Sequence, residues 1–247
     1  MEKINALKFT LSGKLACFRK PETNAGTYLT YSCIHKVALM GILGSIIGLK
    51  GYNQIKKEKG VITLPEFHEK LKKLKISIIA PRENIVQQVI SFNNSTGIAS
   101  QEEGGNLIVK ETVLNNPSWE IFILDDKSEE YNKIKDYILN SKSKFIPFLG
   151  RNDYYANISN TNIVELEKNN NENLVYDSIV IAELKDCLPS KRKFGINIKD
   201  FLTIEELPIS LNKKTAHYEY QQFLNTTSNI RKKENTYNYA NKVLFFF

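Results

Sequence analysis

The sequence has few cysteines, few arginines and no apolar run long enough to cross a membrane. Three cysteines in 247 residues, widely spaced and without a CxxC pair, argue against a structural zinc site and against a disulfide framework. The apolar run 37–49 is shorter than the roughly 20 residues that a membrane span needs, and we interpret it as a buried helix. The first residues lack the uninterrupted apolar core of a signal peptide. These absences predict a protein of the reducing cytoplasm with no membrane attachment.

Motifs of common enzymes are also absent. The three histidines are far apart in the sequence, and no GxSxG, HExxH, P-loop or paired-carboxylate motif occurs. We therefore expect no metal and no cofactor. Metal-free RNA cleavage needs only a general base and a general acid, and Tyr28, Tyr31, His35 and Lys36 could supply them. Their spacing does not require such a site, so a metal-independent ribonuclease stays the alternative to a binding protein.

Positive charge is what the sequence does have. The formal net charge is +7, and only five of the 34 basic residues are arginines. Lysine, asparagine and isoleucine are all abundant, as in proteins of AT-rich genomes, so the net charge alone is weak evidence for a nucleic-acid partner. Arginine presents a planar fork of donors that matches phosphate. Arg19 and Arg151 are therefore more informative than the lysines.

The helix predicted over residues 33–49 is rich in glycine. Ser32 precedes it and can cap its first turn. Gly41, Gly44 and Gly48 fall on one side at helical spacing, and each costs roughly 1 kcal/mol relative to alanine in an isolated helix. We therefore expect this side of the helix to pack closely against the protein's own sheet.

The remaining elements follow from periodicity and turn residues. We predict strands over 4–12, 75–80 and 144–149, a short helix around Phe67 and Leu71, a helix capped by Asp126 with Tyr131, Ile134 and Ile138 on its apolar face, and a projecting hairpin over about 84–114. The order strand, helix, two paired strands, helix, strand is that of ferredoxin-like folds, which often offer their sheet to RNA. The predicted fold is α+β: a ferredoxin-like (RRM-like) domain over 1–150 with the hairpin, and a smaller, mostly β part over 151–247.

Three segments combine cations, hydroxyls and rings in a way that suits RNA. They are FRKP from Phe18, TYLTYS from Thr27 and LGRND from Leu149. Cations contact phosphates and rings stack on unpaired bases, while the first turn of a helix favours an anion. The same residues could instead form a solvated loop, core or capping contacts, and a tight turn. The predicted RNA-binding residues are Lys14, Arg19, Lys20, Thr27, Tyr28, Thr30, Tyr31, Ser32, His35, Lys36, Gly150, Arg151 and Asn152.

In these segments the sequence resembles CRISPR-associated protein family five, in the form found in type I-B systems. The similar blocks are LSGKLACFRKP, TYLTYSCIHKVALMGILGSIIGL, NPSWEIFI and FIPFLGRNDYYANI. The resemblance covers the first two thirds of the chain, and the last part adds little beyond its apolar end. It places FRKP, TYLTY and the LGR turn on the surface that would hold a short, bent RNA.

The resemblance implies a subunit of a Cascade-type surveillance complex in antiviral defence. In that family an RRM-like domain with a hairpin thumb grips the 5′ handle of the CRISPR RNA (crRNA), caps the filament of backbone subunits and docks the large subunit, so target DNA is met only indirectly. The type I-C branch cleaves the repeat with a Tyr, Lys and His set. Residues 84–114 contain no histidine, so we expect a non-catalytic protein, with cleavage of CRISPR repeat RNA as the alternative.

Overall fold

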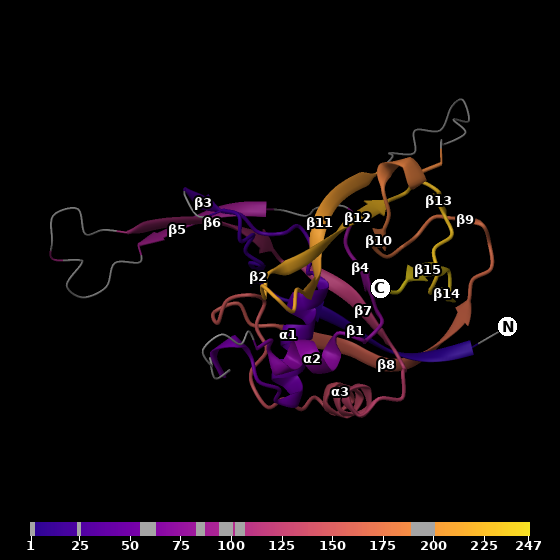
Figure 1. Cartoon of the computed structure of the whole chain (residues 1–247), viewed down its shortest axis with the longest axis horizontal. Coiled ribbons are helices and arrows are strands. Elements are labelled where there is room, and N and C mark those ends of the chain that lie inside the picture. Colours follow the sequence, from indigo (N-terminus) through magenta and orange to yellow (C-terminus); the bar gives the residue numbers. More distant parts are fainter. Residues whose placement is uncertain are drawn as a thin grey trace.

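The computed structural model describes residues 3–23, 26–54, 63–82, 87–93, 101, 107–188 and 201–247. It has an α+β fold in which strands predominate (Figure 1). Its helices are α1 (Lys36–Ile47), α2 (Glu66–Leu71) and α3 (Glu129–Leu139), with 3-10 turns at Tyr52–Gln54 and Leu184–Asp186. Its strands are β1 (Lys3–Ser12), β2 (Leu15–Ala16), β3 (Thr27–Tyr28), β4 (Ile76–Ile79), β5 (Gln87–Asn93), β6 (Ile108–Asn115), β7 (Ser118–Leu124), β8 (Asn157–Lys168), β9 (Asn173–Leu174), β10 (Val180–Ile181), β11 (Leu202–Leu211), β12 (Tyr218–Thr226), β13 (Ile230–Arg231), β14 (Thr236–Tyr239) and β15 (Lys242–Phe245).

The main sheet has the strand order β15-β14-β8-β1-β7-β4. β1 is antiparallel to both of its neighbours, and β4 is antiparallel to β7. The predicted alternation in β1 is confirmed, because Leu7, Phe9 and Leu11 are fully buried. These side chains join one core cluster with α1 and α3, and in Figure 1 the helices gather on one side of the strands. A smaller cluster, which includes Phe122 and Phe246, fills part of the opposite face.

Helix α1 begins three residues later than predicted. His35, and not Ser32, caps it: the His35 Nδ1 atom accepts a hydrogen bond from the Ala38 amide at 3.2 Å. Ser32 is used elsewhere, since its amide and hydroxyl both donate to Glu205 Oε2, at 3.0 and 2.6 Å. Ser32, the residue that local sequence preference assigns to the helix cap, is therefore engaged in a tertiary contact with Glu205 instead.

The three glycines of this helix have three different environments. A Cβ added to Gly44 would lie 2.5 Å from the Cβ of Phe67, so only here is close packing required, and it is against α2. A Cβ added to Gly41 would meet nothing within 4 Å. Gly48 ends the helix with φ +84, a left-handed conformation that favours glycine. The prediction of a glycine face against the sheet is therefore wrong, although the one close contact is within the chain.

Replacing Gly44 with leucine should destabilise the protein by about 1–3 kcal/mol, because the new side chain overpacks against Phe67. The matched control is Gly41→Leu, in the same helix, whose side chain enters open space and should not lower stability. Denaturant unfolding of both variants measures the difference. Equal midpoints for Gly44→Leu and the wild type would contradict the contact.

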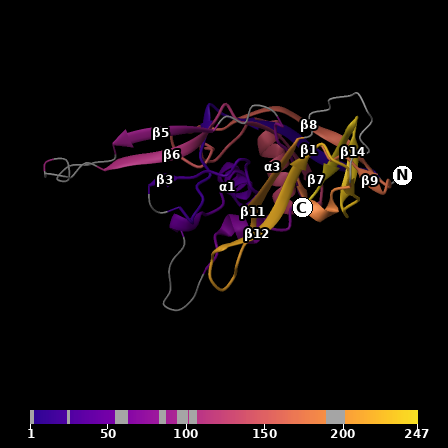
Figure 2. The ribbon, with the colours of Figure 1, turned by 90° about the horizontal axis from the view of Figure 1, so that it is seen from above.

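The predicted hairpin is present as an antiparallel pair of β5 and β6, with Gln87 opposite Leu114 and Asn93 opposite Ile108. It projects from the body in both views (Figure 1, Figure 2). Most of its predicted tip lies outside the described residues. At its base β6 also pairs with β2 and, in parallel, with β3. The hairpin is thus hydrogen-bonded to the segments on either side of FRKP.

The segment from Lys144 is not the predicted strand. The amides of Lys144 and Phe145 donate to carbonyls at the end of α1, and the side chains of Phe145 and Ile146 are 53% and 70% exposed. The place beside β1 is taken by β8, whose register with β1 runs from Lys3–Glu167 to Ser12–Asn157. The division at residue 150 stays a prediction, but strands from both sides of it share this sheet.

Other parts of the second half fill the core. β11 and β12 form a long antiparallel hairpin, and Tyr218 of β12 contacts His35 edge to face at 5.5 Å between ring centroids. The apolar end of the chain is buried, as Phe245, Phe246 and Phe247 show. The basic turn predicted at Lys191 lies outside the described residues. No helix in the described ranges is long and apolar enough to cross a membrane.

Helix α3 has the predicted apolar face but a different cap. Tyr131, Ile134 and Ile138 are buried. Ser128 is the cap, and its hydroxyl accepts from the Tyr131 amide at 3.1 Å. Asp126, the predicted cap, instead accepts from the amide and hydroxyl of Ser128. Asp126 therefore holds the capping residue Ser128 in place from a position before the helix.

Candidate nucleic-acid interface

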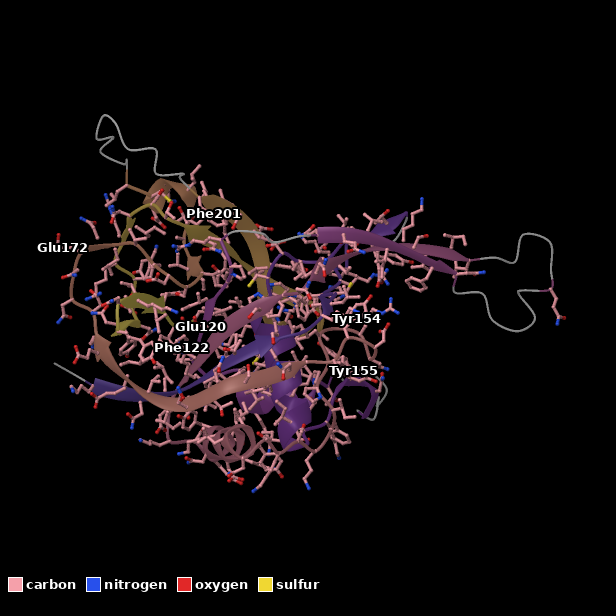
Figure 3. All side chains as sticks on the ribbon, turned by 180° about the vertical axis from the view of Figure 1, so that it is seen from behind. Glu120, Phe122, Tyr154, Tyr155, Glu172 and Phe201 are labelled. Carbon is pink, nitrogen blue, oxygen red and sulfur yellow. The ribbon has the colours of Figure 1, made fainter. Side chains whose placement is uncertain are left out.

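The three segments predicted to bind RNA lie next to one another. The Cys17 amide donates to the Leu149 carbonyl at 3.0 Å, and the Tyr31 amide donates to the Phe18 carbonyl at 3.0 Å. FRKP is therefore bonded to TYLTY, and Cys17, the residue directly before FRKP, is bonded to the LGR turn. Figure 3 shows Tyr154, just beyond the LGR turn, on the side of the body that carries the hairpin.

The turn at Gly150 depends on the absence of a side chain. Its φ is +90, and an added Cβ would lie 1.8 Å from the carbonyl oxygen of Cys17. The glycine lets the LGR turn approach the FRKP segment directly. Asn152, two residues later, is exposed.

Arg19, which is exposed, stacks on the half-buried ring of Tyr28. The guanidinium carbon of Arg19 lies 3.5 Å from the centroid of the Tyr28 ring, and Arg19 Nη2 donates to the Thr23 carbonyl at 3.3 Å. Tyr28 and Thr27 make up β3, which holds them beside Glu111 and Lys110 of the hairpin. A cation stacked on a ring offers a flat surface for a base and a charge for a phosphate. Among the described residues predicted to bind RNA, this pair is the one that combines a stacked ring with an exposed cation.

Arg151 has a different role, because two carboxylates hold it. It forms ion pairs with Glu111 at 2.6 Å and with Asp153 at 3.1 Å. Its guanidinium also lies over the rings of Phe92 and Tyr154, at 4.8 and 5.2 Å. Since Glu111 is buried on β6, the arrangement fixes the base of the hairpin to the LGR turn. Much of the charge of Arg151 is neutralised there.

Several predicted RNA-binding residues belong to the interior instead. Thr30 is buried, and its hydroxyl accepts from the Phe18 amide at 2.9 Å. Tyr31 is buried, and burial, with a smaller effect of its hydrogen bond to Tyr220, raises its pKa. Ser32 bonds to Glu205, as described above. These hydroxyls organise the protein rather than face a ligand.

His35 and Lys36 are also buried. Burial lowers the pKa of His35 to about 3, and the rings of Phe18, Tyr31 and Tyr218 surround it. Lys36 Nζ donates to the main-chain oxygen of Phe247 at 3.0 Å, and burial, with a smaller effect of Lys75, lowers its pKa to about 8. Tyr28 lies on the surface while its three predicted catalytic partners are internal. The four residues do not share one exposed site.

Comparison with protein families decides the relationship. The family described as CRISPR-associated protein (Cas_Cas5), in its Cas5d model, matches residues 6–186. The chain belongs to the CRISPR-associated Cas5 family. The type I-B form that we expect is not established by this match, and the subtype remains a prediction. No curated protein matches the sequence.

Two solved structures share the fold of this Cas5-family chain. One is titled "CRISPR RNA-guided surveillance complex" and aligns with a TM-score of 0.52 at 13% identity, over 92% of this chain and 91% of the other. The second is a CRISPR protein from Archaeoglobus fulgidus, with a TM-score of 0.51 at 11% identity over 98% of both chains. At these identities the comparison establishes a shared fold.

Two functional positions of the Cas5-family chain were missed from sequence. Glu111 and Phe92 hold Arg151 from two strands of the hairpin. Phe92 falls in a run that we read only as a strand, and no spacing connects residues 92, 111 and 151. The one available signal was Glu111 itself, a carboxylate inside the strand sequence IVKETVL.

The remaining cations among the predicted RNA-binding residues are Lys14 and Lys20. Lys14 is exposed. Lys20 forms an ion pair with Glu205 at 2.7 Å and lies 5.0 Å from the ring centroid of Tyr31.

Across the described part of the chain, no three His, Cys, Asp or Glu side chains are grouped so as to hold a metal ion.

Proposed function

We propose that this chain is a non-catalytic subunit of a type I-B CRISPR surveillance complex and binds the 5′ handle of the crRNA. In this proposal it caps the filament of backbone subunits, docks the large subunit and meets target DNA only indirectly, in the cytoplasm. Family membership supports a role in CRISPR defence. The antiparallel order β8-β1-β7-β4, with α1 and α3 as the connecting helices, supports the RRM-like classification of the body.

The observation that carries the proposal is the Arg19–Tyr28 pair at the base of the hairpin. Single-stranded RNA is held by stacking of its bases on rings and guanidinium planes and by cations along its backbone. The pair offers both within 3.5 Å. Lys110 of β6 is opposite Thr27, one residue from the partner of Tyr28, so its cation lies on the other face of this sheet. A short RNA could therefore lie along the line where the hairpin leaves the body.

Removal of the Tyr28 ring should weaken RNA binding about five- to hundredfold, as expected for the loss of one stacked base. Arg19→Ala should lower the slope of log affinity against log salt by roughly one or less. Arg151→Ala should change this slope less, because two carboxylates neutralise Arg151. Fluorescence anisotropy with labelled repeat RNA at several salt concentrations measures all three effects.

The control for these variants is Lys3→Ala. Lys3 is an exposed cation at the start of β1, paired with Glu165, and the N-terminal end lies on the far side of the body from the hairpin (Figure 1). If Lys3→Ala and Arg19→Ala weaken RNA binding equally, the RNA is attracted by the overall positive charge of the protein and not by a specific contact with Arg19. If affinity does not depend on salt, the phosphate part of the proposal is wrong.

Incubation of the purified protein with repeat RNA in EDTA separates this proposal from the alternative endoribonuclease. We expect intact RNA, because His35 is neutral and buried. Cleavage at one position of the repeat would contradict the non-catalytic role. Co-purification with backbone subunits tests membership of the complex separately, so the two parts of the proposal can fail independently.

A further inference from the structure

Two neighbouring cavities lie near helix α1, and residues of this helix line only the inner one. The inner one has a volume of about 330 Å³ and the outer one of about 550 Å³. Tyr52 and Tyr218 line both, so the cavities share a wall. Pro21 and Glu22 line the outer cavity, which places it next to FRKP but beyond the Arg19–Tyr28 pair. The Arg19–Tyr28 pair lines neither cavity, whereas Phe18 of FRKP and Gly150 of the LGR turn line the inner one.

The inner cavity is apolar and owes its space to a glycine. Gly41 faces it, and a Cβ there would meet nothing within 4 Å. Phe18, Phe67 and Phe148 contribute rings to its wall. The described side chains of its lining that carry a hydroxyl are Ser45, Tyr52 and Tyr218, and the Ser45 hydroxyl donates to the Ile42 carbonyl at 2.8 Å. Since an apolar cavity of about 150 Å³ is enough for benzene, this one has room for two large apolar side chains.

The outer cavity is aromatic and carries negative charge. Glu22 is exposed there, and its Oε1 accepts from the Tyr220 hydroxyl at 2.8 Å. The rings of Tyr218 and Tyr220 meet edge to face, with centroids 6.1 Å apart. No lysine or arginine lines either cavity among the residues that the structure describes. A carboxylate beside half-buried rings is a site for a cation.

We infer that the two cavities form a docking site for a segment of a partner protein, in which large apolar side chains are followed by a basic residue. The apolar side chains would occupy the inner cavity, and the basic group would lie between Glu22 and the rings of Tyr218 and Tyr220. RNA fits less well, because Glu22 repels phosphate and, among the described residues, no lysine or arginine lines either cavity to attract it. The inference does not rest on the proposed function.

The decisive variant is Gly41→Leu, which fills the inner cavity from the helix. It replaces a helix glycine without a clash, so the melting temperature should rise by about 2–4 °C. The probe is the peptide acetyl-Gly-Leu-Phe-Gly-Arg-Gly-amide, and the readout is the NMR signals of isotopically labelled Tyr52 and Tyr218. At millimolar peptide we expect these signals to shift in the wild type and to stay unchanged in Gly41→Leu.

The attraction between Glu22 and the basic residue of the partner segment is tested with the variant Glu22→Lys and with a peptide that carries Glu in place of Arg. The wild type should prefer the Arg peptide by about two- to fivefold, and Glu22→Lys should reverse the preference. RNA affinity of Gly41→Leu should equal that of the wild type, whether or not the proposed RNA function holds.

Three results would overturn the inference. The first is the absence of any peptide-induced shift in the wild type at millimolar concentration. The second is a loss of RNA affinity in Gly41→Leu, which would assign the cavity to the RNA surface. The third is a change from dimer to monomer in Gly41→Leu, which would make a second copy of this chain the occupant.

Discussion

Replacing Gly150 with alanine is expected to destabilise the protein by about 3–5 kcal/mol, the combined cost of a strained left-handed residue and of overpacking. The φ of Gly150 is +90, and a Cβ there would lie 1.8 Å from the carbonyl oxygen of Cys17 and 2.8 Å from its carbon. Both atoms belong to the main chain, so no side chain can rotate away. The LGR turn would have to separate from the FRKP segment.

Gly26→Ala is the matched control for this substitution. Gly26 also has a positive φ, +74, but nothing lies within 4 Å of an added Cβ. It should therefore show only the conformational cost, about 1 kcal/mol. Urea unfolding of the two variants separates strain from collision. Equal losses of stability would mean that the LGR turn can move off Cys17, and that the proximity of the three segments is not fixed.

Gly150→Ala should also weaken RNA binding at temperatures where the variant is still folded. Displacement of the turn moves Arg151, and with it the ion pair that holds Glu111 of the hairpin. Arg19 and Tyr28 would then lose their fixed position relative to β6. Native affinity in a destabilised but folded variant would contradict this coupling.

Local patterns were enough to predict most of the elements. The period-two burial of β1, the apolar face of α3 and the pairing of β5 with β6 follow from residues near each other in sequence. The proximity of FRKP, TYLTY and the LGR turn came from the family resemblance, since no periodicity connects residue 18 with residue 150. The hydrogen bonds between these segments agree with it.

Long-range contacts explain what the sequence did not predict. Glu205 accepts hydrogen bonds from Ser32, the predicted helix cap, and β8, not the segment from Lys144, is the strand that pairs with β1. The burial of His35 depends on Tyr218, which is far along the chain. Sequence chemistry indicated which side chains carry groups suited to RNA, and their RNA binding stays a prediction. It could not indicate which of them the second half of the chain covers.

Acid should destabilise this protein through His35. Its pKa in the folded state is about 3, because burial disfavours the charged ring, whereas an unfolded histidine has a pKa near 6.5. Below pH 6.5 the unfolded chain binds a proton at this histidine that the folded chain does not. The free energy of unfolding therefore decreases by about 1.4 kcal/mol for each unit by which the pH is lowered. The loss from this one group should reach about 3 kcal/mol at about pH 4. His68, whose pKa burial also lowers, should contribute in the same direction.

His35→Asn isolates this effect, because asparagine can still cap α1 but does not titrate. The variant should be less stable than the wild type at neutral pH, since it loses ring contacts with Phe18, Tyr31 and Tyr218. The informative readout is the slope of unfolding free energy between pH 6 and 4, which should be smaller by about 1.4 kcal/mol per unit. His68 is present in both proteins and cancels. An unchanged slope would mean that His35 takes up a proton in the folded state, and a histidine that titrates there would again be a candidate general base for RNA cleavage.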